Sequence, residues 1–240
     1  MAQHILRKDL KKDEIRETFV HGVEAVASHQ QFLGAVVIAA LVVGLAYFGW
    51  GSYSRRQTAK AAAALGDGMK LFQARIRAAG EPEQPGETSY VEEKNKYGDA
   101  EKKFLQVASQ YGRTRPGQIA RYYAALSEIQ VKKYADAEKN LKLLDSSGDE
   151  SLSSLARFQL AGVYDQEGKA TQAAEVYKQL IDKPTIFVPK PLVLLTLADH
   201  YRQSDPAQAT KLYTQVKQEF PDTSAADKAD EDLQLLNAKS

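Results

Sequence analysis

The chain has 240 residues, a formal net charge of +1 at pH 7 and no cysteine. This balance of charge lacks the basic excess that is typical of proteins binding nucleic acid. Without cysteine there can be no disulfide, thiolate metal site, cysteine nucleophile or lipid-modified cysteine. The histidines have no metal-ligand spacing and are His4, His21, His29 and His200. We expect no nucleic-acid partner, cofactor, metal or small-molecule substrate.

Residues 1–31 form a short N-terminal tail with an amphipathic pattern. Apolar residues recur in it at helical spacing, at Ile15, Phe19, Val23 and Val26. A helix with this stripe could lie on the cytoplasmic headgroups of a membrane, dock against another membrane protein, or be a solvated lead-in helix. The sequence leaves these three alternatives open.

Residues 32–54 carry the longest apolar run, and the segment Phe32–Gly51 contains no charged residue. At about 1.5 Å per residue this segment makes roughly 30 Å of helix, the thickness of a bilayer's hydrocarbon core. A cleaved signal peptide has a shorter apolar core nearer the N-terminus, and a buried core helix normally has one polar face. The segment therefore predicts an uncleaved single-pass transmembrane helix, with Tyr47, Trp50 and Tyr53 at one membrane interface.

The basic residues that flank this helix do not decide its orientation. Cytoplasmic flanks are enriched in Lys and Arg, and close to the helix this rule favours a cytoplasmic C-terminal side, where Arg55 and Arg56 follow. Arg7, Lys8 and Lys11 restore the balance when the whole tail is counted. The charges alone are compatible with either orientation.

After the apolar helix, the sequence repeats a helical pattern at steps of 37, 36 and 36 residues. In the aligned segments 97–107, 134–144, 170–180 and 206–216, one alanine recurs at the same position, as Ala100, Ala137, Ala173 and Ala209. Four residues after the alanines stand Phe104, Leu141, Tyr177 and Tyr213. Three residues further on stand Val107, Leu144, Leu180 and Val216. This spacing makes the apolar face of an amphipathic helix, with the alanine allowing a close helix contact.

A second helical pattern precedes three of these segments, so each unit is predicted to be helix, turn, helix. The pattern resembles the tetratricopeptide repeat. The third unit carries the resemblance at Leu160, Ala161, Tyr164, Gly168, Ala173, Tyr177 and Pro184. The fourth carries it at Leu197, Ala198, Tyr201, Ala209, Tyr213 and Pro221. The second unit departs from it, since Glu128 replaces a usual aromatic residue and Lys132 replaces a preferred glycine.

The expected fold is all-α, with one N-terminal transmembrane helix and a tetratricopeptide-like solenoid of about four helical hairpins over residues 55–223. The opening helix of the first unit is expected over residues 58–79. Residues 81–95 contain Pro82, Pro85 and Gly86 and predict a loop. No strand is predicted.

Residues 224–240 are expected to form a C-terminal capping helix, because the end of a solenoid needs a polar outer face. Ser224 is the predicted N-cap. Leu233 and Leu236 are expected to pack on the last repeat, while water faces Asp227, Asp230, Glu231 and Asp232.

The sequence shows no catalytic constellation. Nucleophilic catalysis needs a base within hydrogen-bond reach and a group that orients it. His200 follows Asp199 on a predicted helix, but adjacent helical residues do not face each other. We expect a surface or packing histidine and no enzymatic activity.

A tetratricopeptide solenoid usually binds its partners on the concave face of its opening helices. Carried over to this sequence, the polar or small positions of that face are Gly162, Asp165, Asp199 and Arg202. The apolar positions predict a partner-binding groove for apolar segments or a partner's helix, and are Ile119, Tyr122, Leu126, Ile129, Leu155, Phe158, Leu192 and Leu195. The alternative is that neighbouring helices cover some of these side chains.

The layout of tail, anchor and repeats resembles the YfgM-type family, ancillary subunits of the bacterial SecYEG translocon. That resemblance implies an inner-membrane anchor, a cytoplasmic N-terminus, periplasmic repeats, and partnership with SecYEG and a PpiD-like prolyl isomerase. It also implies chaperone-like help for unfolded, newly exported clients. The alternative function is a membrane-tethered scaffold that assembles another cell-envelope complex without holding clients.

Overall fold

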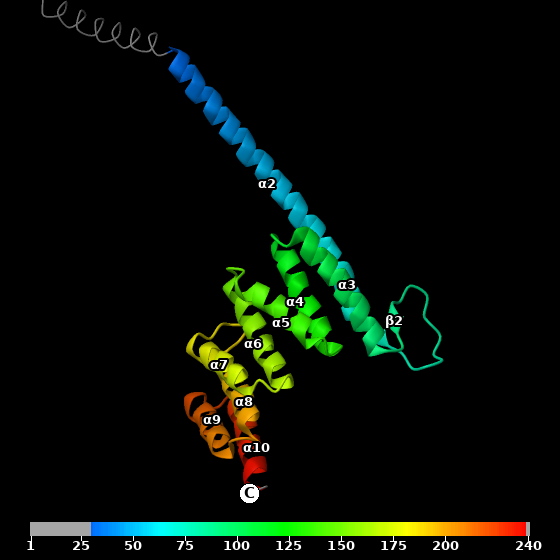
Figure 1. Ribbon diagram of the computed structural model, residues 1–240, viewed down its shortest axis with the longest axis vertical. Helices are drawn as coiled ribbons and strands as arrows, with labels where there is room; N and C mark the ends of the chain where they lie inside the picture. Colours follow the sequence, from blue (N-terminus) through cyan, green and yellow to red (C-terminus); the bar gives the residue numbers. More distant parts are fainter. Residues whose placement is uncertain (1–29, 239–240) are drawn as a thin grey trace, which may run out of the picture. The chain divides into compact units, whose positions relative to one another are not determined.

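The computed structural model describes residues 30–238, which form nine helices and two short strands (Figure 1). The predicted all-α class, with a long apolar helix ahead of helical repeats, is confirmed. By its internal contacts the chain divides into two units between Arg56 and Gln57. The tail with its predicted amphipathic stripe, and with His4, His21 and His29, lies outside the described residues.

Helix α2 (Gln30–Phe72) contains the predicted transmembrane segment. From Gly34 onward it is long and apolar enough to span a bilayer, with a mean hydropathy of 2.0 and none of its apolar window buried. Large apolar side chains are exposed along it, including Leu45, Phe48 and Trp50. A core helix of a soluble domain would bury such side chains, so by length, composition and exposure this helix could span a membrane.

The opening helix predicted for the first repeat, residues 58–79, is not a separate element. Helix α2 runs without a break to Phe72, since the alanines of Ala61–Ala64 favour helix and no proline interrupts the segment. The helix also ends earlier than predicted. Two strands follow it, β1 (Arg75–Ile76) and β2 (Ser89–Tyr90).

These strands correct the expectation that the chain has none. They pair in parallel, with Arg75 opposite Ser89 and Ile76 opposite Tyr90, and they close the predicted loop at its base. The Arg75 guanidinium adds ion pairs to Glu81 at 2.9 Å and to Glu87 at 3.3 Å. Strands of two residues are too short to show the alternating pattern by which a strand is recognised in a sequence.

Helix α3 (Glu93–Tyr111) packs against the C-terminal part of α2. The contact is close at Gly68, where a β-carbon would lie 2.5 Å from the Phe104 ring. The rings of Phe72 and Phe104 are 6.1 Å apart, and both contact Tyr123 of α4 (Arg115–Gln130) at 5.4 and 5.5 Å. An aromatic cluster therefore joins the end of α2 to the first helices of the repeat array.

Three helix pairs and a last helix follow one another from green to red in Figure 1. The pairs are α4 with α5 (Tyr134–Asp145), α6 (Glu150–Gln166) with α7 (Ala170–Asp182), and α8 (Lys190–Tyr201) with α9 (Pro206–Glu219). All twelve side chains of the aligned apolar stripe, on α3, α5, α7 and α9, are at most 2% exposed. The hydrophobic core therefore runs along the closing helices of successive repeats.

Helix α10 (Ser224–Asn237) packs on the last repeat through Leu233 and Leu236, as the sequence predicts. The N-cap prediction is wrong by one residue, because the Thr223 side chain accepts the Ala226 N–H at 3.3 Å. The prediction that Asp232 faces water is also wrong. Its side chain is 3% exposed and lies 2.6 Å from the guanidinium of Arg202, the residue that follows α8, and 3.3 Å from Lys228 Nζ, so two cations compensate its burial.

Candidate partner-binding groove

The eight apolar residues of the predicted groove lie on the opening helices α4, α6 and α8. Leu192 is 40% exposed, and the other seven are half-buried. Those that also pack against the main hydrophobic core are Tyr122, Ile129, Leu155, Phe158 and Leu195. Each of these side chains thus stabilises the array with part of its surface and leaves the rest accessible to a partner.

Two contacts link groove residues to side chains of a neighbouring helix. A hydrogen bond joins Tyr122 of α4 to Gln159 of α6, and burial raises the pKa of the Tyr122 hydroxyl. The Phe158 ring of α6 lies edge-on to Tyr177 of α7, with the ring centroids 6.1 Å apart. Ile119, Leu126 and Leu192 are not among the side chains that pack against the main hydrophobic core.

A polar cluster at the C-terminal ends of α6 and α8 was not predictable from the sequence pattern. His200 Nδ1 lies 2.6 Å from Asp165 Oδ1, and the Tyr177 hydroxyl donates to Asp165 Oδ2 at 3.2 Å. The His200 side chain is 7% exposed, so it is a packing histidine whose partner is Asp165 and not its neighbour Asp199. Burial, and then the Asp165 charge, raise the pKa of Tyr177. The separation of Asp165 and His200 by about one repeat length is the signal that could have revealed the pair.

A second polar cluster joins α8, α9 and α10. The Tyr213 hydroxyl donates to Asp199 Oδ1 at 2.6 Å and accepts from Arg202 at 2.9 Å, while Arg202 also contacts Asp232. Burial raises the pKa of Tyr213, and the Asp199 carboxylate adds to this effect. Asp199 and Arg202, predicted as groove positions, thus hold helices together. Asp199 also keeps half of its side chain in water.

Glu128 of α4 is a buried carboxyl, 1% exposed. Its two oxygens accept from Asn140 Nδ2 at 2.9 and 3.0 Å, and Arg121 donates to Asn140 Oδ1 at 2.9 Å. Burial is the main reason that the pKa of Glu128 rises to about 7; the Asn140 hydrogen bond opposes the rise, and the nearby charge of Glu101 adds to it. This network lies inside the second repeat and serves its packing.

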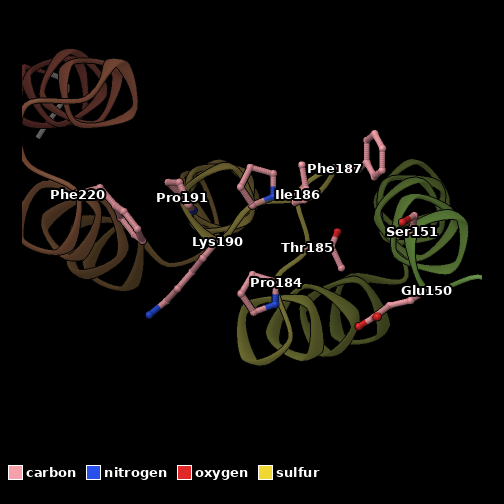
Figure 2. A pocket seen from close by; sticks show the side chains of 10 residues that line it. Glu150, Ser151, Pro184, Thr185, Ile186, Phe187, Lys190, Pro191 and Phe220 are labelled. Atoms are coloured by element: carbon pink, nitrogen blue, oxygen red, sulfur yellow. The ribbon is translucent and has the colours of Figure 1, made fainter.

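A surface hollow of about 660 Å³ lies where α6 and α8 begin and α7 and α9 end. Figure 2 shows Phe220, Pro191 and Lys190 on one side of the loop that precedes α8, with Ser151 and Glu150 on the other. No sequence pattern indicates this hollow, because its lining residues come from separate parts of the chain. Within residues 30–238, no group of three or more His, Cys, Asp or Glu side chains could hold a metal ion.

The stacked helix pairs, with partly exposed apolar side chains on their opening helices, define a helical-repeat protein that binds other proteins. The chain belongs to the tetratricopeptide repeat-like domain family, whose profile matches residues 28–185. The match includes the whole of α2 as well as the first three repeats. No curated protein and no solved structure matches the chain significantly.

Proposed function

We propose that this chain is a membrane-anchored, protein-binding accessory of the bacterial Sec translocon, of the YfgM type, which assists newly exported proteins. The observation that carries the proposal is the joining of one unburied apolar helix to a protein-binding repeat array within a single family match. In this proposal, residues 1–31 are a cytoplasmic tail, 32–54 the inner-membrane anchor, 55–223 the periplasmic repeats and 224–240 the capping helix. The partners are SecYEG, a PpiD-like prolyl isomerase and unfolded exported clients, held in the groove.

Topology is the first test, because a translocon role on the outer side needs exported repeats. Alkaline phosphatase is active only outside the cytoplasm, so a fusion after Ser240 should be active in living cells. Protease added to spheroplasts should remove the repeats and leave the tail protected. An inactive fusion with protected repeats would place the domain in the cytosol and rule the proposal out.

Client binding is the second test. The full-length protein in lipid nanodiscs should suppress the aggregation of a denatured protein at near-stoichiometric ratios, measured by light scattering. Replacing Tyr122, Phe158 and Leu195 with Ser should weaken this suppression, since the three project from equivalent places on α4, α6 and α8. Leu192→Ser tests the same face with less risk to the fold, because Leu192 is 40% exposed.

Leu143→Ser is the matched control, since Leu143 is an exposed apolar residue on the closing helix α5, outside the groove. The control should bind clients like the wild type, and circular dichroism should report unchanged helix content in all variants. Equal client binding by the Leu192 and Leu143 variants would remove the groove from the proposal.

The alternative is a membrane-tethered scaffold that assembles a cell-envelope complex without holding clients. The packing of five of the eight groove residues against the core favours it, because a face already partly covered suits one folded partner better than varied unfolded chains. Absence of any suppression by the correctly oriented wild-type protein would support this alternative.

A further inference from the structure

The joints between successive repeats are not alike. At the first two joints, a carboxylate one residue after the alanine of one repeat pairs with a lysine four residues before the alanine of the next. Lys133 Nζ donates to both carboxylate oxygens of Glu101 at 2.8 Å, and Lys169 Nζ donates to Glu138 Oε2 at 3.0 Å. Both carboxylates are largely buried, so solvent screens these pairs less than ordinary surface pairs. A recurring ion pair therefore fastens the first three repeats to one another.

The joint between the third and fourth repeats cannot form this ion pair. Ala174 and Asp205 stand at the two equivalent positions. Asp205 instead caps α9, because its side chain accepts the Gln208 N–H at 3.0 Å. The connection is also longer at this joint, since residues 183–189 separate α7 from α8 whereas residues 146–149 separate α5 from α6. The third joint thus has neither the fastening ion pair nor a short connection.

A hollow separates the third and fourth repeats at one end of this joint. It lies where α6 and α8 begin, has a volume of about 660 Å³, and has Pro191 and Phe220 of the fourth repeat on one side (Figure 2). The α7–α8 loop stays with the third repeat, because Thr185 Oγ1 lies 2.9 Å from Ser154 Oγ of α6 and Val188 is buried. Bending at this joint is therefore confined to the residues between Val188 and the start of α8.

A polar contact closes the other end of the same joint. Asp165 and His200 lie near the C-terminal ends of α6 and α8, with Oδ1 and Nδ1 2.6 Å apart. The Tyr177 hydroxyl of α7 donates to the second oxygen of Asp165 at 3.2 Å, so three helices meet at this carboxylate. The His200 side chain is 7% exposed, whereas that of Asp165, at a predicted groove position, is 28% exposed. A partner in the groove can therefore reach this contact.

We propose that the joint between the third and fourth repeats is a hinge, and that the contact between Asp165 and His200 is the latch that holds it closed. The pivot lies after Val188, beside the hollow, and the latch lies at the far end of α6 and α8. Hinges commonly consist of a few residues at the ends of helices or strands, as here. The hydrophobic core continues across the joint, so the two repeats bend against each other and do not separate.

The helices beyond the pivot move as one body. Lys190, at the start of α8, pairs with Glu219 of α9. Arg202, which follows α8, pairs with Asp232 of α10. These ion pairs tie α8, α9 and α10 together on the far side of the hinge.

The hinge also bears on the groove, and this step rests on the proposed function. Leu155 and Phe158 lie on α6, on one side of the joint, and Leu192 and Leu195 lie on α8, on the other. Turning at the joint changes the separation between these two pairs. The groove thus adjusts its width to the partner that it holds.

Equivalent positions on three closing helices allow a matched test, because the chain has no cysteine that would compete for a spin label. Lys139, Glu175 and Lys211 each follow the alanine of their repeat by two residues, and all three are exposed. Double electron–electron resonance is measured on the full-length protein in lipid nanodiscs. Labels at Lys139→Cys and Glu175→Cys span the fastened second joint and are the control, whereas labels at Glu175→Cys and Lys211→Cys span the hinge. We expect the distance distribution across the hinge to be about twice as broad as that of the control.

The latch is tested from both of its sides. Asp165→Ala and His200→Phe each remove the contact, and the phenylalanine keeps a ring in the place of the imidazole. Each variant should broaden the distance distribution across the hinge and leave the control distribution unchanged. Glu138→Gln, which weakens the fastening ion pair of the second joint, should instead broaden the control distribution.

Far-UV circular dichroism should report the same helix content in all these variants. Equal widths for the hinge and the control in the chain without latch substitutions would overturn the hinge. No response of the hinge distribution to either latch variant would overturn the latch. These distances do not depend on the topology or client-binding results, so the proposal stands or falls separately from the proposed function.

Discussion

The second and third repeats build the same turn from different residues. In the third repeat, Gly168 adopts a φ of 72°, and the Lys169 N–H donates to the Tyr164 carbonyl at 2.8 Å. In the second, Lys132 adopts a φ of 60°, and the equivalent hydrogen bond ends at Glu128, also at 2.8 Å. Both turns have the Schellman pattern that ends many helices. The stacking of the helix pairs therefore imposes the geometry of both turns, and the residue at the left-handed position changes only the free energy of adopting it.

The difference extends from the turns into the packing of the two repeats. Tyr164 fills its position with an aromatic ring and reaches Glu138 at 3.4 Å with its hydroxyl. Glu128 fills the equivalent position with a carboxyl that, among residues 30–238, contacts the amide of Asn140 and no cation. A buried carboxyl is expensive to ionise. The second repeat is therefore the one whose stability should respond to pH.

The largest expected effect is the loss of stability as Glu128 ionises. Its pKa is about 7 in the folded chain against 4.5 as the ordinary value. Because the folded state holds the proton more tightly, the stabilisation is complete below pH 4.5 and is lost as the pH rises through about 7. The wild type should lose about 3 kcal/mol of unfolding free energy across this window relative to Glu128→Gln.

Urea denaturation of the full-length protein in detergent micelles, followed by far-UV circular dichroism between pH 4 and 8, measures this difference. Other groups titrate in the same range, and Glu138 has a lowered pKa because of its hydrogen bond to Lys142. These contributions are common to both proteins and cancel in the difference. A difference independent of pH would mean that Glu128 is ionised at little cost in the folded chain.

The next effect concerns the buried alanine that the second and third repeats share. Ala137 and Ala173 are both 0% exposed and lie at equivalent close helix contacts. Leucine at either position should overpack the contact and cost about 1–3 kcal/mol of unfolding free energy, measured by the same denaturation. Ala170→Leu, at an exposed site on the first turn of α7, is the control and should change stability little. If Ala137→Leu were harmless while Ala173→Leu were not, the second repeat would be the more loosely packed of the two.

The repeat array was predictable from the sequence because its signal is periodic. Ala100, Ala137, Ala173 and Ala209 recur with their apolar partners, and a buried stripe leaves that trace in any amphipathic helix. The junction between the anchor and α3 was not predictable in the same way. The continuity of α2 to Phe72 and the pairing of β1 with β2 depend on tertiary contacts. Strands of two residues are also too short to leave a pattern in the sequence.

The candidate sites also divide into those that follow from the repeat pattern and those that depend on contacts between different elements. Groove positions follow from the repeat register, so Tyr122, Phe158 and Leu195 could be named in advance, whereas their partial burial could not. The pairing of Asp165 with His200 and the hollow beside Ile186 are assembled from different helices and loops. Such sites depend on how neighbouring repeats are placed, and the sequence pattern of a single repeat carries no information about that placement.

The smallest expected effect is the exchange of the two turn residues themselves. A left-handed backbone costs a residue with a side chain about 1–2 kcal/mol, and glycine avoids this cost. Lys132→Gly should therefore stabilise the second repeat by about 1 kcal/mol, and Gly168→Lys should destabilise the third by a similar amount. Lys132→Ala separates backbone from side chain, because it removes the charge but keeps the left-handed strain, and its stability should stay near that of the wild type. Amide hydrogen exchange would locate each effect in its own repeat. It is measured on α4 and α5 for Lys132→Gly and Lys132→Ala, and on α6 and α7 for Gly168→Lys. If Lys132→Ala stabilised the chain as much as Lys132→Gly, the cost at this turn would come from the lysine side chain and not from the backbone that the stacked helices impose.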